Sequence, residues 1–186
     1  MKNSKLRNVT AVLAKIIEVV SWAGAVLMVV STFVLGFTAD DIQQAYANGF
    51  INTDNIKVEP SAGFTADWLL QTVIDGKAAV IFVPFIVILV ISALIFRNVY
   101  LIFKKTNTAS PFAEENIKKI RNIGILTIAL PISKIIMSIL CQVLTHSTNY
   151  MLSVELSEIV IGLVALCLTQ YFAYGAQLEK DVDGLL

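Results

Sequence analysis

The amino-acid sequence predicts an all-α polytopic membrane protein, and two observations lead to this class. Of the 186 residues, 56% are hydrophobic and 15% are charged, whereas a soluble domain has about 45–50% apolar and about 25% charged residues. Four apolar runs also reach the roughly 20 residues that an α-helix needs to cross the bilayer core. We therefore exclude a water-soluble fold and expect four transmembrane helices with a small extracytoplasmic cap and a cytoplasmic interfacial helix.

The whole chain, residues 1–186, is predicted to form a single membrane domain. The first apolar run follows a basic arm, as a signal peptide does, but the run is too long and no cleavage site of the A-x-A type follows it. We expect this run to remain as the first helix. The predicted spans are residues 16–37, 78–96, 123–144 and 159–178, joined by an outer loop over 38–77 and a cytoplasmic loop over 97–122.

The positions of lysine and arginine predict the orientation of the spans. Four lie in the N-terminal arm, six in the loop 97–122 and one in the tail, whereas the outer loop has two and the loop 145–154 has none. Because positive residues stay on the cytoplasmic side, both termini are predicted to face the cytoplasm. The outer loop carries six carboxylates, so the opposite face is acidic.

The outer loop contains a short internal repeat. Residues 36–49 and 63–76 agree at seven of fourteen aligned positions. Each copy begins with a threonine that can cap a helix N-terminus and ends with a glycine suited to a helix C-cap, so each predicts a short amphipathic helix. Between them, residues 50–60 predict a small hairpin. The capping residues are Thr38 and Gly49 in the first copy and Thr65 and Gly76 in the second.

Two interpretations of this cap stay open. In the first, it is a lid that senses a ligand or a peptide. In the second, which we favour, it is a packed loop whose aromatic side chains lie at the membrane interface, where aromatic residues are enriched. The apolar residues concerned are Phe37, Phe64, Trp68 and Leu69.

The second half of the cytoplasmic loop has the pattern of a helix start. Ser110 is the predicted N-cap, Pro111 the first helical residue, and Glu114 and Glu115 follow in the first turns. Each glutamate has a lysine four residues later, which favours ion pairs along the helix. We expect this helix to run into the third span. Its cations either bind anionic lipid headgroups or an acidic protein, or only set the topology. The candidate docking residues are Lys104, Lys105, Lys118, Lys119 and Arg121.

Two motifs stand out, one that begins Ser110-Pro111-Phe112 and continues to Gly124, and one in the tail from Gly175 to Asp181. These motifs resemble the bacterial 2975 family of domains of unknown function. That resemblance implies a small four-helix protein of the bacterial inner (plasma) membrane, often encoded beside a small helix-turn-helix regulator, and it implies no catalytic residues. Ala109 departs from the glycine expected before the Ser-Pro-Phe element, which affects the conformation of the loop. The motif residues are Ser110, Pro111, Phe112, Glu115, Asn116, Arg121, Gly124, Gly175, Leu178 and Asp181.

One charged residue, Lys134, falls near the centre of the third predicted span, where an ionised side chain costs roughly 2.5–3.5 kcal/mol. Small and polar residues share its helix face, so this face is predicted to turn inward. Glu18, with Ser21 beside it, and Gln170 are the candidate partners by depth. The cluster either forms a pocket for an ion, proton or small ligand or holds the helices in register. The face-sharing residues are Thr127, Pro131, Ser138 and Cys141.

These two interpretations of Lys134 predict different results for Lys134→Met. A functional pocket predicts loss of activity in a folded protein. A structural contact, which we favour because intramembrane polar contacts commonly contribute only ~0.6 kcal/mol yet specify packing, predicts loss of the folded protein itself.

The sequence also lacks the motifs of common catalytic and metal sites. His146 is its only histidine, so no histidine-based metal cluster or catalytic dyad is expected. Cys141 and Cys167 lie in apolar runs and are predicted to pack as small hydrophobic residues. Balanced charge gives no reason to expect direct nucleic-acid binding. We therefore expect a non-enzymatic protein without a cofactor or metal.

The predicted function is that of a regulatory or accessory protein that lies in the lipid bilayer and binds a cytoplasmic partner, such as a small DNA-binding regulator. Two alternatives come from other classes: a small oligomeric transporter or channel that uses Lys134, and an immunity-type protein whose outer cap recognises a peptide. Deleting residues 40–75 separates the last from the first, because cytoplasmic docking survives that deletion. Homo-oligomerisation is left open.

Overall fold

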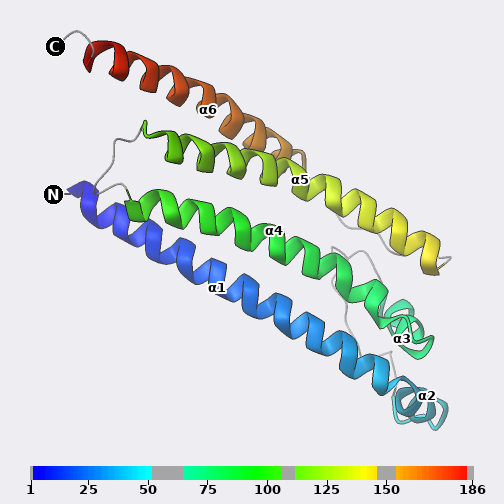
Figure 1. Ribbon diagram of the computed structural model, residues 1–186. Helices are drawn as coiled ribbons and strands as arrows, with labels where there is room; N and C mark the ends of the chain where they lie inside the picture. The colour runs from blue at the N-terminus through cyan, green and yellow to red at the C-terminus, as the bar shows by residue number, and fades with distance from the viewer. Residues whose placement is uncertain (1, 52–64, 106–111, 146–153, 184–186) are drawn as a thin grey trace. The chain divides into compact units, whose positions relative to one another are not determined.

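The computed structural model describes residues 2–51, 65–105, 112–145 and 154–183, and it consists of helices (Figure 1). Within these residues there is no strand, so the predicted all-α class is confirmed. The hairpin predicted over 50–60 lies almost wholly outside the described residues. The long helices are α1 (Lys2–Phe37), α4 (Ala78–Lys105), α5 (Glu114–Thr145) and α6 (Leu156–Asp183), and the short ones are α2 (Ala39–Ala47) and α3 (Ala66–Ile74).

Each of the four long helices is long and apolar enough to cross a membrane. Each contains one of the four predicted spans and extends beyond it at one or both ends. Large apolar side chains point away from the protein along these helices, for example Leu27 and Phe33, which are 66% and 63% exposed. Such surfaces are unfavourable in water and favourable against lipid tails, so the exposed faces match a bilayer environment.

Contacts within the chain define two compact units. Unit 1 comprises residues 1–22, 90–131 and 155–186, and unit 2 comprises residues 23–89 and 132–154. Helices α1, α4 and α5 each contribute a segment to both units, whereas α6 belongs to unit 1 and the short helices α2 and α3 belong to unit 2. The single-domain prediction concerns the whole chain and stays a prediction.

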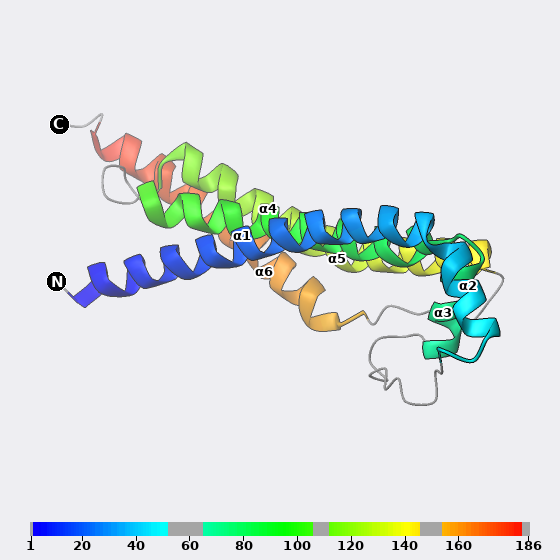
Figure 2. The same ribbon diagram turned by 90° about the horizontal axis from the view of Figure 1, so that it is seen from below.

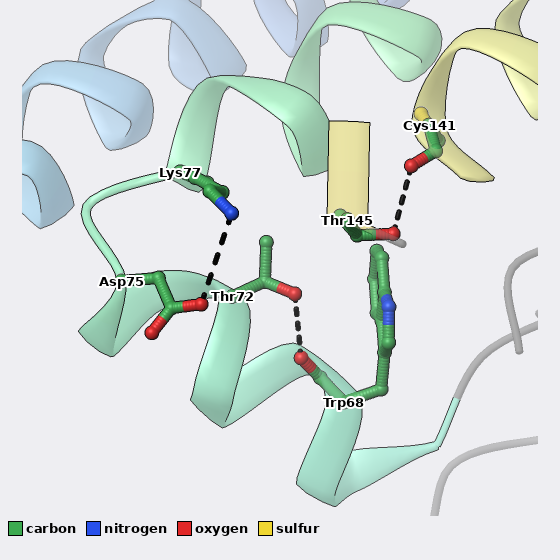
Figure 3. Close-up of polar contacts among 6 residues, drawn as sticks. All are labelled: Trp68, Thr72, Asp75, Lys77, Cys141 and Thr145. Atoms are coloured by element: carbon green, nitrogen blue, oxygen red, sulfur yellow. Dashed lines mark hydrogen bonds and ion pairs between the residues drawn. The ribbon is translucent and has the colours of Figure 1, made fainter. Parts of the chain in front are cut away.

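The core of unit 2 forms where α3 meets the beginning of α4 and the end of α5. Buried Trp68 and Val73 of α3 pack with Ala78 and Ile81 of α4 and with Cys141 of α5. Figure 3 shows the Trp68 side chain reaching from α3 toward Thr145, in the last turn of α5. Trp68 is 7% exposed and completes this core, which agrees with the predicted packed loop, while its depth at the membrane interface stays a prediction.

The two copies of the repeat form neighbouring helices, α2 and α3, which contact each other (Figures 1 and 2). Both copies end as predicted: Gly49 and Gly76 have φ angles of 75° and 72°, a region that glycine adopts without steric cost. The next amide in each copy bonds five residues back, Phe50 to Ala45 and Lys77 to Thr72, which is the Schellman motif.

The two copies begin differently. The Thr65 hydroxyl accepts a hydrogen bond from the Trp68 amide at 3.2 Å, so this threonine is the predicted N-cap. The prediction for Thr38 is wrong, because its hydroxyl donates backward to the Val34 carbonyl at 3.0 Å. The Thr38 amide also bonds to the Val34 carbonyl, and only Thr38 separates α1 from α2. The first copy of the repeat therefore follows α1 directly and has no side-chain N-cap.

Helix α5 begins later than the sequence predicts. The described helix starts at Glu114, and the carbonyl of Ala113 accepts its first hydrogen bonds, from Asn116 and Ile117. Phe112 and Ala113 are not helical, so α5 does not begin as early as predicted. The predicted N-cap Ser110 and first helical residue Pro111 lie outside the described residues. The rest of the prediction is confirmed, since Glu114 and Glu115 occupy the first turn and the helix continues without a break to Thr145.

Candidate functional site

The sequence motifs in α5 and α6 meet in unit 1, where the two helices approach closely at a pair of glycines. A Cβ atom built on Gly162 would lie 3.1 Å from the Gly124 carbonyl oxygen and 3.2 Å from the Ile128 amide nitrogen. A Cβ atom on Gly124 would lie 3.1 Å from the Gly162 carbonyl oxygen. Only glycine permits the backbones to come this near, which is how small residues act in membrane helix packing. Gly124 belongs to the predicted motif set, and Gly162 was not identified from the sequence.

A second contact joins the beginning of α5 to the end of α6. The Phe112 ring lies against Gly175, where a Cβ atom would come within 2.8 Å of the ring. The same ring packs against Phe172 with centroids 5.6 Å apart. The structure therefore brings together two motif elements that lie about 60 residues apart in the sequence. The further motif residue Asn116 is buried nearby in the first turn of α5.

Beside this contact, the ends of the two helices enclose a cavity of about 450 Å³. Its walls combine apolar side chains, including Phe112 and Ile117, with the charged or polar side chains of Glu114, Gln177 and Lys180. Lys118 and Arg121 are exposed on α5 at helical spacing from Glu114, so they continue the face that borders the cavity. A mixed apolar and charged cavity of this kind is suited to binding a side chain or a short segment of another molecule.

The predicted docking cations do not all lie on this face. Lys119 is largely buried, with its side chain 10% exposed, and its ammonium pairs with Glu115 at 2.9 Å. Because it is buried and paired, Lys119 belongs to the packed interior of unit 1 and not to the exposed face. Lys104 belongs to α4, where its ammonium lies over the Tyr100 ring, and Lys105 ends that helix.

Glu114 and Lys118 form an exposed ion pair that shifts the pKa of each partner. A hydrogen bond from the Lys118 ammonium, at 2.8 Å, and its positive charge lower the pKa of Glu114 below 4.5, and the same pair raises the pKa of Lys118 above 10.5. The small stabilisation from this pair is present above the unfolded pKa of the carboxyl group and is lost as the pH falls through its lowered pKa. At the alkaline end it is lost as the pH rises through the raised pKa of Lys118. The pair is therefore charged throughout the neutral range.

The structure places the remaining motif residues at the surface. Leu178 is 48% exposed and Asp181 is exposed, both in the last turns of α6. Glu115 is 58% exposed and reaches back over Lys119. The motif thus divides into packing residues, at which the two helices touch, and exposed polar residues at the helix ends.

The predicted intramembrane polar cluster is divided between the two units. Lys134 is half-buried in unit 2, whereas Glu18, Ser21 and Gln170 belong to unit 1. Within unit 1, Glu18 and Ser21 are buried, each 6% exposed, but Gln170 is exposed on α6. The carboxylate of Glu18 forms an ion pair with Lys15 of its own helix at 3.0 Å. The cluster of four stays a prediction.

The small and polar face of α5 turns inward, as predicted. Pro131 is among the most completely buried side chains, and Ser138 and Cys141 are 6% and 3% exposed. Thr127 is half-buried, and its hydroxyl bonds within the helix to the Ile123 carbonyl. Lys134 lies on the same face by helical spacing.

This face also holds a contact between two helices that the sequence did not reveal. Pro84 interrupts α4, and because proline has no amide hydrogen, the carbonyl of Val80 loses its partner within the helix. The Cys141 thiol of α5 donates to that carbonyl at 3.1 Å. One helix therefore supplies the donor that the other lacks, which satisfies a backbone group inside the bilayer.

We expect Cys141→Ala to lower the stability of the detergent-purified protein by about 0.6–1 kcal/mol, because Val80 then has no donor. Cys141→Ser is the matched control and should retain most of the stability, since a hydroxyl also donates. In a Pro84→Ala background, residue 84 regains its amide hydrogen and Cys141→Ala should cost measurably less. Thermal unfolding of the four combinations of Pro84→Ala and Cys141→Ala gives this coupling, and equal costs in both backgrounds would contradict the assignment.

Among the described residues, no group of three or more histidine, cysteine, aspartate and glutamate side chains is arranged to hold a metal ion. The described geometry consists of helix packing, a cavity at the helix ends and exposed charged turns. Together with the four long apolar helices, these features define a multi-pass α-helical membrane protein.

No family model, no curated protein and no solved structure matches this chain. The resemblance to the 2975 family therefore stays a prediction from the motif residues. What the structure adds is a physical role for several of them in the packing of α5 against α6.

Proposed function

We propose that this protein is a regulatory or accessory protein of the bacterial inner membrane that binds a soluble cytoplasmic partner at the joined ends of α5 and α6. The observation that carries the proposal is the cavity of about 450 Å³ in unit 1, whose walls are partly apolar and partly charged. The proposed binding face consists of this cavity and the exposed Lys118 and Arg121 beside it.

The lengths of the helices support a site outside the lipid. Helix α5 begins nine residues before the predicted span at 123–144, which at 1.5 Å per residue is about 13 Å of helix. Helix α6 continues past 178 to Asp183. Both polar ends lie in unit 1 and are held together by Phe112 against Gly175, so the binding face rests on a packed base.

The excess of lysine and arginine near these ends favours the cytoplasmic side. A basic face on α5 attracts a partner with a complementary acidic surface, and electrostatic complementarity mainly increases association rate and specificity. The resemblance to the 2975 family suggests a small helix-turn-helix regulator as that partner. The protein would then tether or sequester the regulator at the membrane.

Site-specific photocrosslinking in the native cells tests this proposal. A photoreactive residue in place of Gln177, which lines the cavity, should capture one soluble protein that carries a helix-turn-helix domain. The same probe in place of Leu144, exposed at the other end of α5, is the control and should not. The charge reversals Lys118→Glu and Arg121→Glu together should remove the crosslink without lowering expression, because exposed ion pairs contribute little to stability.

Two outcomes would overturn the proposal. One is a crosslink only to lipid or to a second copy of the protein, which would favour the transporter or channel that uses Lys134. The other is a crosslink to a soluble protein that persists at full yield after both charge reversals. In that case the basic face of α5 does not select the partner.

A further inference from the structure

A second cavity in unit 1, of about 310 Å³, lies between α1 and α4 and has a different character. Its walls are formed by the basic residues Lys15 and Arg97, the buried Glu18, and Tyr100 with Leu101. None of these residues belongs to the α5 and α6 face. A cavity that combines two cations with an aromatic ring is suited to an anion.

The Tyr100 ring of this cavity lies close to two ammonium groups, those of Lys15 and Lys104. The Lys15 ammonium lies 5.2 Å from the centre of the Tyr100 ring, and the Lys104 ammonium lies 5.5 Å from it, distances at which a cation is attracted to the ring. Glu18 fixes Lys15 further through the ion pair at 3.0 Å. The cavity lining thus holds two cations, Lys15 and Arg97, and one carboxylate, Glu18, so it has an excess of positive charge.

Arg97 provides the donor for a ligand. Among the described residues, this arginine has neither an ion pair nor a hydrogen bond. Its planar guanidinium presents paired N–H donors that match two phosphate oxygens. Lys15 of α1, whose side chain is 47% exposed, also lines the cavity and adds a second positive charge.

The depth of the cavity in the membrane indicates the source of the phosphate. Arg97 directly follows the uncharged run 78–96 of α4, and Lys15 directly precedes the predicted span 16–37 of α1. Both residues therefore lie at the edge of the hydrocarbon layer, where lipid phosphates are found. Tyr100 suits the same level, because tyrosine is enriched at the interface.

We propose that this cavity binds the phosphate group of an anionic phospholipid, with Arg97 and Lys15 as its ligands and Tyr100 with Glu18 as positioning residues. Basic cavities between transmembrane helices are a known mode of headgroup recognition. The bound lipid joins α1 to α4 within unit 1. This site differs from the protein-binding face on α5 and α6 in residues and in ligand.

Native mass spectrometry of the full-length protein, released from detergent with added phosphatidylglycerol or phosphatidylcholine, tests the proposal. The wild-type protein should retain phosphatidylglycerol in preference to phosphatidylcholine. Arg97→Gln should weaken phosphatidylglycerol binding by about tenfold, since a hydrogen-bonded charge pair is lost. Arg7→Gln removes one charge from α1 outside the cavity and should leave binding unchanged.

Further variants and a second probe decide between the outcomes. Arg97→Lys keeps the charge and should weaken binding by less than Arg97→Gln, which provides a readout if Arg97→Gln folds poorly. Equal loss for Arg7→Gln and Arg97→Gln would overturn the proposal, because binding would then follow total charge. Inorganic phosphate that competes with phosphatidylglycerol at equal concentration would also overturn it, in favour of a site for a free anion.

Discussion

Gly162→Leu is expected to lower the melting temperature of the detergent-purified protein by roughly 5–10 °C, with a loss of monodisperse protein. Even the first carbon of a new side chain would lie 2.5 Å from Ile128 Cγ1 and 3.1–3.2 Å from backbone atoms of α5. A flexible side chain can move away, but these backbone atoms cannot, so α5 and α6 must separate. Thermal unfolding followed by size-exclusion chromatography measures the effect.

Gly36→Leu is the matched control for this substitution. Gly36 is a helical glycine near the end of α1, and a Cβ atom there would meet no other atom within 4 Å. Its replacement should be neutral or slightly stabilising, because glycine in a helix costs about 1 kcal/mol relative to alanine. A Gly162→Leu protein as stable as wild type would show that α5 and α6 do not pack at this point.

Gly175→Leu is expected to release the beginning of α5 from the end of α6. The added side chain would occupy the position of the Phe112 ring, which lies within 2.8 Å of a Cβ atom on residue 175. The ring can swing away, so the expected loss of stability is smaller than for Gly162, about 1–2 kcal/mol. Amide hydrogen exchange in residues 114–118 should become faster, because this turn loses its packing.

The control for Gly175→Leu is Cys167→Leu, which adds bulk on an exposed part of α6 that does not line the cavity. Exchange in residues 114–118 should then match the wild-type protein. If Gly175→Leu left this exchange unchanged, Phe112 would not anchor the start of α5. Under the proposed function, Gly175→Leu should also reduce the crosslink from residue 177, because the cavity shares Phe112 as a wall.

The prediction of four long apolar helices was confirmed because each depends on a long apolar run. A run of about 20 predominantly apolar residues has one stable conformation in a bilayer, since every backbone group must be bonded within the segment. The glycines that end α2 and α3 were predictable for a similar reason, because a left-handed residue at a helix end requires little beyond its own backbone. In both cases, interactions within one short segment are sufficient to determine the local structure.

Predictions that depend on packing were less accurate. Thr38 and Thr65 occupy equivalent positions in the repeat, yet only Thr65 caps a helix, because α1 already supplies a partner for the amide of Thr38. Trp68 was predicted to belong to a packed cap, but the sequence did not reveal that it packs in the core of unit 2 against α4 and α5. Thr38 bonds to Val34, four residues earlier at the end of α1, whereas the neighbours of Trp68 include Cys141, which is distant in sequence.

The candidate site was partly predictable. The motif residues around α5 and α6 were identified, but their contact at Phe112 and Gly175 joins two segments whose spacing carries no signal of proximity. Gly162 was overlooked, although a glycine inside an apolar span is typical of a helix contact. The donation from Cys141 to the carbonyl freed by Pro84 also depends on which helices are neighbours.

The sequence by itself determined the class of protein, the four spans, the short paired helices and the distribution of charge that predicts orientation. These features follow from hydrophobicity, helix capping and the positive-inside rule, which act over one segment at a time. Only the tertiary structure decided which glycines touch, where Trp68 packs, and which cations share a cavity. Those contacts depend on shape complementarity between helices. The interactions within each apolar helix are the same whichever helices it packs against, so they do not select the pairing.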